Sequence, residues 1–281
     1  MGEILDGRAL ADQLQIKLKE EVEQLPFSPK LVVILVGDDG ASEIYVRNKK
    51  RAAEKVGIIS VVENLPKETS EAELLALINR YNEDPETDGL IVQLPLPAHL
   101  NEEKIISAVD PAKDVDGFHP ENAGLLLTGK NQLVPSTPLG IMTLLNHYGI
   151  SVAGKIATVV GRSNIVGKPM AQLLLQNDAT VIMTHSKTKN LAEMTKLADI
   201  LIVAIGRGQF ITADYVKEGA VVVDVGMNRN AEGKLVGDVD FKQVEPLASF
   251  ITPVPKGVGP MTITSLLQQT VKAAKIRRGI S

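Results

Sequence analysis

Cysteine and tryptophan are both absent from the 281 residues, and only 3% of the residues are aromatic. Without cysteine the chain has no disulfide, thiol nucleophile or thiolate metal site, and the few aromatics argue against a stacking surface for single-stranded nucleic acid. No apolar run approaches the ~20 residues of a membrane helix, and residues 1–14 lack the segments of a secretory signal. With 30 basic and 34 acidic residues, we expect a cytoplasmic globular protein without a nucleic-acid or membrane partner.

The first half of the chain alternates short runs rich in valine and isoleucine with longer amphipathic segments. This pattern predicts strands over 31–37, 58–65 and 88–97, and helices over 42–56 and 69–82. Continuous apolar strands that are separated by helices are typical of a parallel sheet covered on both faces. Residues 110–137 interrupt the alternation with many Pro, Gly, Asp and Asn residues, and we interpret them as a long functional connection.

The second half restarts the alternation with four short strands, KIATVVG, ATVIMTH, DILIVAIG and AVVVDVG. Their regular spacing predicts a doubly wound sheet. The final helical segment follows a Pro/Gly turn, and we expect it to return to the first domain. The fold class is therefore α/β with two domains: a three-layer domain over residues 1–137, completed by 262–281, and a Rossmann-type dinucleotide-binding domain over 138–261.

A glycine turn, VVGRSNIVGKP (159–169), joins a strand to a helix in the second half. It matches neither G-x-G-x-x-G nor the Walker A pattern, so on its own it fits a phosphate site and an ordinary turn equally well. Its place as the first strand-to-helix turn of the second sheet favours a dinucleotide pyrophosphate.

The next strand ends in THSKTK (184–189), where an NAD-binding protein would carry an acid for the ribose hydroxyl. Two lysines here, and Arg162 in the turn, suit a phosphate on that ribose, and each charge-assisted hydrogen bond contributes about 1.5–3 kcal/mol. The pattern favours NADP over NAD, and the alternative is a set of solvated loop cations.

Three polar positions in the first half are candidates for chemistry. Tyr45 and Lys49 lie four residues apart, on one face of the predicted helix. Gln93 lies at a strand end, where parallel sheets bind ligands. The alternatives are a basic solvent face and an ordinary strand-end residue. The four histidines lack metal-ligand spacing, so no metal site is expected.

Several long segments, in order along the chain, resemble one family: VQLPLP, DVDGFHP, GRSNIVGKPMAQLL, HSKT and TPVPKGVGPMT. They are similar to the bifunctional methylenetetrahydrofolate dehydrogenase/methenyltetrahydrofolate cyclohydrolases, and YVRNKKRAAEKVGI resembles the catalytic helix of that family. The resemblance implies hydride transfer from 5,10-methylenetetrahydrofolate to NADP, then hydrolysis of the methenyl product to 10-formyltetrahydrofolate, in one-carbon metabolism. It also implies a homodimer.

The resemblance assigns roles to individual residues. Lys49 is the catalytic lysine and Gln93 its hydrogen-bonding neighbour, while Tyr45 and Asp116 bind the folate. The other implied contacts are Gly257, Val258, Gly259 and Pro260 for the substrate, and Gly161, Arg162, Ser163, Ile165, Ser186 and Met227 for NADP. Lys256 replaces the first of two family glycines, and it either contacts the anionic tail of the folate or lines the rim of the site.

The implied hydrolysis makes a demand on Lys49. A lysine assists proton transfer at neutral pH only if its pKa falls well below the ordinary ~10.4, and burial or a nearby cation lowers it. We predict that Lys49 points into a cleft beside Gln93, while Lys50 and Arg51 face solvent.

Two other functions fit the same sheet pattern. One is an NADP-dependent dehydrogenase of another small substrate, such as a shikimate-type enzyme. The other is a nucleotide-sensing regulator, which would bind cofactor without turnover and leave Tyr45, Lys49 and Gln93 scattered.

Overall fold

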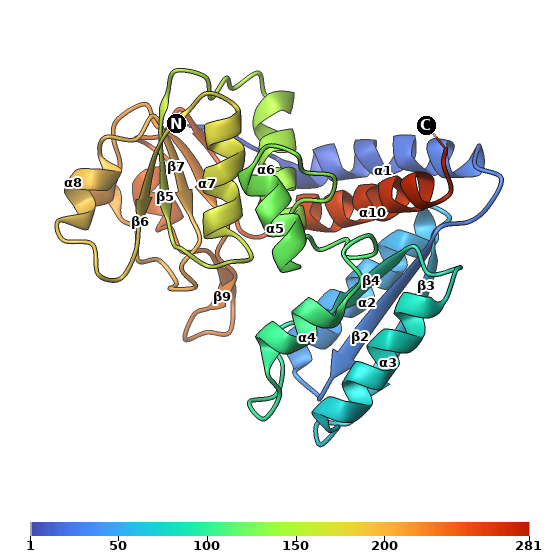
Figure 1. Ribbon diagram of the computed structural model, residues 1–281. Helices are drawn as coiled ribbons and strands as arrows, with labels where there is room; N and C mark the ends of the chain where they lie inside the picture. The colour runs from blue at the N-terminus through green and yellow to red at the C-terminus, as the bar shows by residue number, and fades with distance from the viewer. Residues whose placement is uncertain (1, 281) are drawn as a thin grey trace. The chain divides into compact units, whose positions relative to one another are not determined.

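The computed structural model describes residues 2–280, which form two compact units (Figure 1). The large-sheet unit comprises residues 1–12 and 137–262, and the small-sheet unit comprises 13–136 and 263–281. The chain passes between the units three times: within α1 (Gly7–Glu23), at the first residue of α6 (Ser136–His147) and within α10 (Val258–Arg277).

The small-sheet unit is built on three parallel strands. β2 (Lys30–Val36) lies between β3 (Ile59–Leu65) and β4 (Gly89–Val92). All residues of β2 except the first are buried. Burial on both faces explains the continuous apolar run KLVVILV, because a strand covered on one face only would alternate with polar residues.

Alternate residues of β2 enter different cores. Leu31, Val33 and Leu35 pack with side chains of α1, α2 (Gly40–Lys55) and α10. Val32, Ile34 and Val36 pack on the opposite face with α3 (Glu71–Glu83) and α4 (Glu102–Ala108). The predicted three-layer arrangement of this domain is therefore confirmed.

The large-sheet unit contains a six-stranded parallel sheet in the order β1-β11-β8-β7-β5-β6. Its strands are β1 (Glu3–Ile4), β5 (Ile156–Val160), β6 (Thr180–Thr184), β7 (Ile200–Val203), β8 (Val221–Asp224) and β11 (Phe250–Ile251). Helix α7 (Gly167–Gln176) packs against β5 and β6, while residues of β7, β8 and β11 enter a separate apolar cluster. The strand order reverses between β5 and β7, which is the point where doubly wound sheets bind dinucleotides.

The structure differs from the sequence-based expectation in several places, and the strand expected over 88–97 is the shorter β4, Gly89–Val92. Residues 1–12 were expected in the first domain, but β1 pairs with β11 and they belong to the large-sheet unit. Helix α5 (Pro120–Leu127) lies within the expected connection over 110–137. The hairpin of β9 (Asn228–Arg229) and β10 (Leu235–Val236) was not expected. Residues 263–281 join the small-sheet unit, in agreement with the expected return of the last helix.

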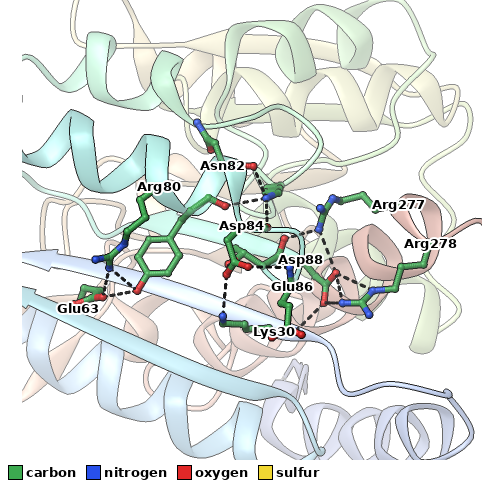
Figure 2. Close-up of polar contacts among 12 residues, drawn as sticks. Lys30, Glu63, Arg80, Asn82, Asp84, Glu86, Asp88, Arg277 and Arg278 are labelled. Carbon is green, nitrogen blue, oxygen red and sulfur yellow. Dashed lines mark hydrogen bonds and ion pairs between the residues drawn. The ribbon is translucent and has the colours of Figure 1, made fainter.

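The end of α10 is bound to the small-sheet unit through Asp88, which precedes β4 and is fully buried (Figure 2). Arg277 Nη1 lies 3.2 Å and Arg278 Nη2 3.0 Å from its carboxylate oxygens. Two cations from one end of the chain therefore neutralise a carboxylate nearly 190 residues earlier. Within residues 2–280, no helix has both the length and the apolar character that a membrane crossing requires.

Candidate active site

Helix α2 presents two of the predicted site residues on one face. The helix begins after Asp39, whose carboxylate accepts a hydrogen bond from Ser42 N at 2.8 Å and so satisfies one free N–H of the first turn. Tyr45 and Lys49 follow one turn apart. Tyr45 is half-buried, and Lys49 is only 3% exposed.

Lys49 and Gln93 are in direct contact. Lys49 Nζ donates to Gln93 Oε1 at 3.1 Å and lies 4.9 Å from the centre of the Tyr45 ring. Gln93 directly follows β4, and its Nε2 donates to Leu94 O at 2.8 Å. Because Gln93 Nε2 donates to Leu94 O, the side-chain amide of Gln93 is oriented with its oxygen towards Lys49 Nζ.

Burial dominates the electrostatics of this cluster. It lowers the pKa of Lys49, and the negative charge of Asp116 opposes that shift. Burial likewise raises the pKa of Asp116, and the positive charge of Lys49 opposes it. Each group is driven towards its neutral form, so the amine is available as a base closer to neutral pH than an exposed lysine.

The two cations that follow Lys49 in the sequence lie in solvent. Lys50 and Arg51 are exposed, and Lys50 Nζ lies 3.9 Å from the exposed Glu54 Oε1. The predictions that Lys49 lies beside Gln93 and that its neighbours face solvent are confirmed. Tyr45, Lys49 and Gln93 converge, which the nucleotide-sensing alternative did not predict.

The loop that carries Asp116 is held by residues that sequence reasoning did not assign to the site. Asp114 is buried and accepts hydrogen bonds from His119 N at 2.8 Å and from Asn122 Nδ2 at 2.9 Å. Asn122 lies in the unexpected helix α5. The spacing of the two acids in DVDG was visible in the sequence, but the partner of the first acid was not.

The glycine turn of the large-sheet unit runs from β5 to α7. Gly161 has φ +125°, and a Cβ there would lie 2.2 Å from Ala204 O. A Cβ on Gly167 would lie 2.4 Å from Gly161 O. Gly161 thus lies against the residue after β7, and the first residue of α7 lies against Gly161, so neither position has room for a side chain. The exposed residues between the two glycines are left at the helix N-terminus. This tight polar turn fits the pyrophosphate of a dinucleotide.

The other expected cofactor residues lie at the same edge of the sheet. Arg162 and Ser163 are exposed in the turn, Ile165 is half-buried there, Ser186 is exposed after β6, and Met227 is 58% exposed after β8. Ser163 Oγ accepts hydrogen bonds from Val166 N and Gly167 N, each at 3.2 Å. The topology gathers these residues because the carboxyl ends of parallel strands share one edge.

The segment Gly257–Pro260 belongs to the large-sheet unit, whereas Tyr45 and Asp116 belong to the small-sheet unit. Lys256, at the position where the resemblance implies glycine, has φ +86° and is exposed. This conformation favours glycine, because the Cβ of other residues approaches the neighbouring carbonyl.

Lys256→Gly is expected to raise the free energy of unfolding by about 0.5–1 kcal/mol, because relief of the left-handed strain exceeds the added entropy of the unfolded chain. Urea unfolding measures the difference. Lys256→Ala is the matched control: it removes the ammonium but keeps the strain, so it should give no gain. An equal gain in both variants would show that charge, not conformation, is responsible.

Two family models match the chain. Residues 5–116 match the model of the tetrahydrofolate dehydrogenase/cyclohydrolase catalytic domain, and residues 135–278 match that of the NAD(P)-binding domain of the same family. The chain belongs to this family. The resemblance inferred from the sequence motifs is confirmed, and so is the expected class of nucleotide-binding domain.

Full-length relatives support the same assignment. The bifunctional protein FolD of Enterococcus faecalis is 60% identical over 98% of this chain and 99% of its own. The crystal structure of the bifunctional FolD methylenetetrahydrofolate dehydrogenase/cyclohydrolase of Campylobacter jejuni superposes with a TM-score of 0.96 at 49% identity, over 99% of this chain and 100% of its own. FolD of Trypanosoma brucei, in complex with NADP and an inhibitor, gives 0.93 at 36% identity, over 98% of each chain.

The shikimate-type alternative is supported only by a similarity of fold. Shikimate 5-dehydrogenase of Thermus thermophilus superposes with a TM-score of 0.57 at 16% identity, over 89% of this chain and 94% of its own. That likeness explains why the sheet pattern of the second domain fitted both enzymes. The tetrahydrofolate dehydrogenase/cyclohydrolase family is the one to which both halves of the chain belong.

Proposed function

We propose that the protein oxidises 5,10-methylenetetrahydrofolate to 5,10-methenyltetrahydrofolate with NADP and hydrolyses the product to 10-formyltetrahydrofolate. The observation that carries the proposal is the buried Lys49 amine, hydrogen-bonded to Gln93 and next to Tyr45, in a chain of this family. A buried lysine with a lowered pKa suits a reaction in which water attacks a cation and must lose a proton.

Each residue of this cluster in the small-sheet unit has its own role in the proposed hydrolysis. Neutral Lys49 accepts the proton that the attacking water loses, and Gln93 Oε1 then holds the ammonium that forms. The carbinol product becomes 10-formyltetrahydrofolate when its O–H loses a proton, the C–N5 bond breaks and N5 receives a proton from the Lys49 ammonium. The negative charge of Asp116 stabilises that ammonium as well. Tyr45 positions the folate, and Asp116 binds its pterin ring. Removing Lys49 would leave the attacking water without this base.

The residues proposed to hold NADP are Gly161, Arg162, Ser163, Ile165, Ser186 and Met227. When bound, NADP supplies the nicotinamide that accepts the hydride, and the protein contributes mainly the relative placement of the two reacting carbons. Arg162, Lys187 and Lys189 are exposed, and no acid occurs in THSKTK, so we propose that NADP is preferred to NAD.

A single spectrophotometric assay tests the function. With 5,10-methylenetetrahydrofolate, absorbance at the wavelength of reduced nicotinamide is expected to rise with NADP and much more slowly with NAD. Separately, absorbance of added methenyltetrahydrofolate is expected to fall faster than in buffer. Cofactor binding without either turnover would support a nucleotide-sensing protein, and turnover of shikimate in their place would support the other dehydrogenase.

Substituting Asp116 is expected to move the pH dependence of hydrolysis. Since neutral Lys49 is the base, kcat/KM rises with pH through the pKa of Lys49 and then levels off. The Asp116 charge raises that pKa, so Asp116→Asn should shift the rising limb to lower pH. The plateau should also fall, because Asp116 binds the pterin. After subtraction of uncatalysed hydrolysis, a limb that stays in place or moves to higher pH would contradict this coupling.

The remaining assignments concern organisation and context. We propose that the domain of residues 1–137, completed by 262–281, binds the folate, that residues 138–261 bind NADP, and that the protein acts in the cytoplasm as a homodimer. The dimer follows from the family resemblance alone. Sedimentation at micromolar concentration tests it, and a mass near the 30.2 kDa of one chain would refute it.

A further inference from the structure

Two carboxylates lie buried at the carboxyl edge of the large sheet. Asp224 ends β8 and is 4% exposed, and Asp238 follows β10 and is fully buried. Within residues 2–280, neither forms an ion pair with a lysine, arginine or histidine. Among the described residues, the hydrogen-bond donors to the two carboxylates are neutral N–H groups, most of them from the main chain.

Asp238 connects two loops through four hydrogen bonds. Its Oδ2 accepts from Ile205 N at 2.7 Å and Gly206 N at 3.0 Å, and its Oδ1 accepts from Arg207 N at 2.7 Å and Asn228 Nδ2 at 2.8 Å. Three of the donors follow β7, and the fourth, Asn228, begins β9 at the end of the segment that follows β8. One side chain therefore sets the course of the chain after two neighbouring strands.

Asp224 holds Asp238 in place. Its carboxylate accepts hydrogen bonds from Gly226 N, Asp238 N and Val239 N, each at 2.9 Å. A Cβ on Gly237 would lie 1.8 Å from Asp224 Oδ2, so the carboxylate packs directly against the main chain before Asp238. The two acids form one unit, in which Asp224 fixes the main chain that carries Asp238.

Stability of the fold does not by itself explain two buried carboxylates. Burial, with a contribution from the charge of Asp238, raises the pKa of Asp224 to about 7. Apolar residues would fill the same space without the desolvation penalty of buried charges. What a carboxylate provides, and an apolar side chain does not, is an acceptor for several converging N–H groups.

The position of these loops in the sheet indicates which half of the cofactor they contact. In a doubly wound sheet the pyrophosphate lies at the first strand-to-helix turn, where the strand order reverses, and the acid that contacts the adenosine ribose follows the next strand. Here that turn follows β5, and β6 lies on the adenosine side. The loops after β7 and β8 are on the other side of the reversal, where the nicotinamide half of the cofactor belongs.

We propose that Asp238, held by Asp224, is the positioning residue for the nicotinamide half of the cofactor. It fixes the loops at 205–207 and 226–228 in the shape that receives that half. The inference rests on the proposed binding of NADP to this sheet, and it assigns Asp238 no contact with the reacting atoms.

Asp238→Asn tests the proposal, because the amide retains the size of the side chain but turns an NH₂ group towards two N–H donors. We expect the Kd for NADPH, measured by fluorescence titration, and the KM for NADP each to rise about tenfold or more, which corresponds to the loss of roughly one charged hydrogen bond. Hydrolysis of methenyltetrahydrofolate, measured without cofactor, should stay within about twofold of the wild type.

The matched control is Asp240→Asn, which makes the same chemical change two residues away. Asp240 caps α9 (Phe241–Val244) and accepts from Gln243 N, with no bond to either loop. Its cofactor affinity should match that of the wild type. If Asp238→Asn does not fold, Asn228→Ala carries the test: it removes one donor to Asp238 and should raise the Kd for NADPH about threefold.

The outcomes separate this inference from the proposed function. An unchanged Kd for NADPH in folded Asp238→Asn, or in Asn228→Ala where that variant carries the test, overturns the inference alone. A loss of both activities in proportion to lost stability also overturns it, because that pattern is structural. If the wild-type protein binds no NADPH, the proposed function and the inference are both overturned. If it binds NADPH without turnover, the proposed function fails, and the Kd values of the variants for NADPH still decide the inference.

Discussion

Lys49→Met is expected to slow the hydrolysis of methenyltetrahydrofolate by roughly 10²–10⁴-fold, the range that one positioned base contributes. Lys49 is 3% exposed and its amine is hydrogen-bonded to Gln93, so the substitution removes the base that is held at this position. Methionine is unbranched and apolar and suits a buried position, so the fold should tolerate it. The decay of methenyl absorbance, corrected for hydrolysis in buffer, measures the rate.

Lys50→Met supplies the matched control for Lys49→Met. It makes the same substitution one residue later, at a side chain that is 47% exposed and contacts only the exposed Glu54 at 3.9 Å among the described ion pairs. Its hydrolysis should stay within about twofold of the wild type. Near-normal hydrolysis by a folded Lys49→Met protein would refute the role of the amine and, with it, the proposed hydrolytic mechanism.

The parts of this site that could be predicted from the sequence are those set by local periodicity. The i, i+4 spacing of Tyr45 and Lys49 places them on one helical face, and the apolar run before Gln93 identifies a strand end. Both patterns depend on residues close in the chain. The contact of Lys49 with Gln93 itself was implied only by the family resemblance, because neither pattern states which helix packs beside which strand end.

Contacts between residues far apart in the sequence could not be predicted from it. A two-residue strand such as β1 carries no periodic signal, and its partner β11 lies almost 250 residues later, so the pairing of β1 with the large sheet was not predicted. Helix α5 is only eight residues long and contains Asn and Gly, which favour turns. The donors to Asp238 are mainly backbone N–H groups. Every residue except proline carries one, so the residue types in the sequence do not predict these hydrogen bonds.

Replacing both arginines at the end of α10 with glutamine is expected to lower the free energy of unfolding by about 3 kcal/mol. Breaking a buried ion pair by removing one partner costs about 3–5 kcal/mol, because a buried charge is left without compensation. Asp88 is fully buried, while the side chains of Arg277 and Arg278 are 21% and 31% exposed, which places the expected cost at the low end (Figure 2). Urea unfolding followed by circular dichroism measures it.

Further variants decide whether the uncompensated carboxylate causes the loss. In the double variant the remaining donor to Asp88 among the described residues is Lys30 N, at 3.0 Å. Adding Asp88→Asn removes the charge, so the triple variant should regain part of the lost stability. Lys275→Gln breaks the nearby pair with Glu21, which is 3.3 Å long and partly exposed, and should cost less than about 1 kcal/mol. A triple variant less stable than the double variant would mean that packing of the arginine side chains, including Arg278 over the ring of Phe27, outweighs the charge of Asp88.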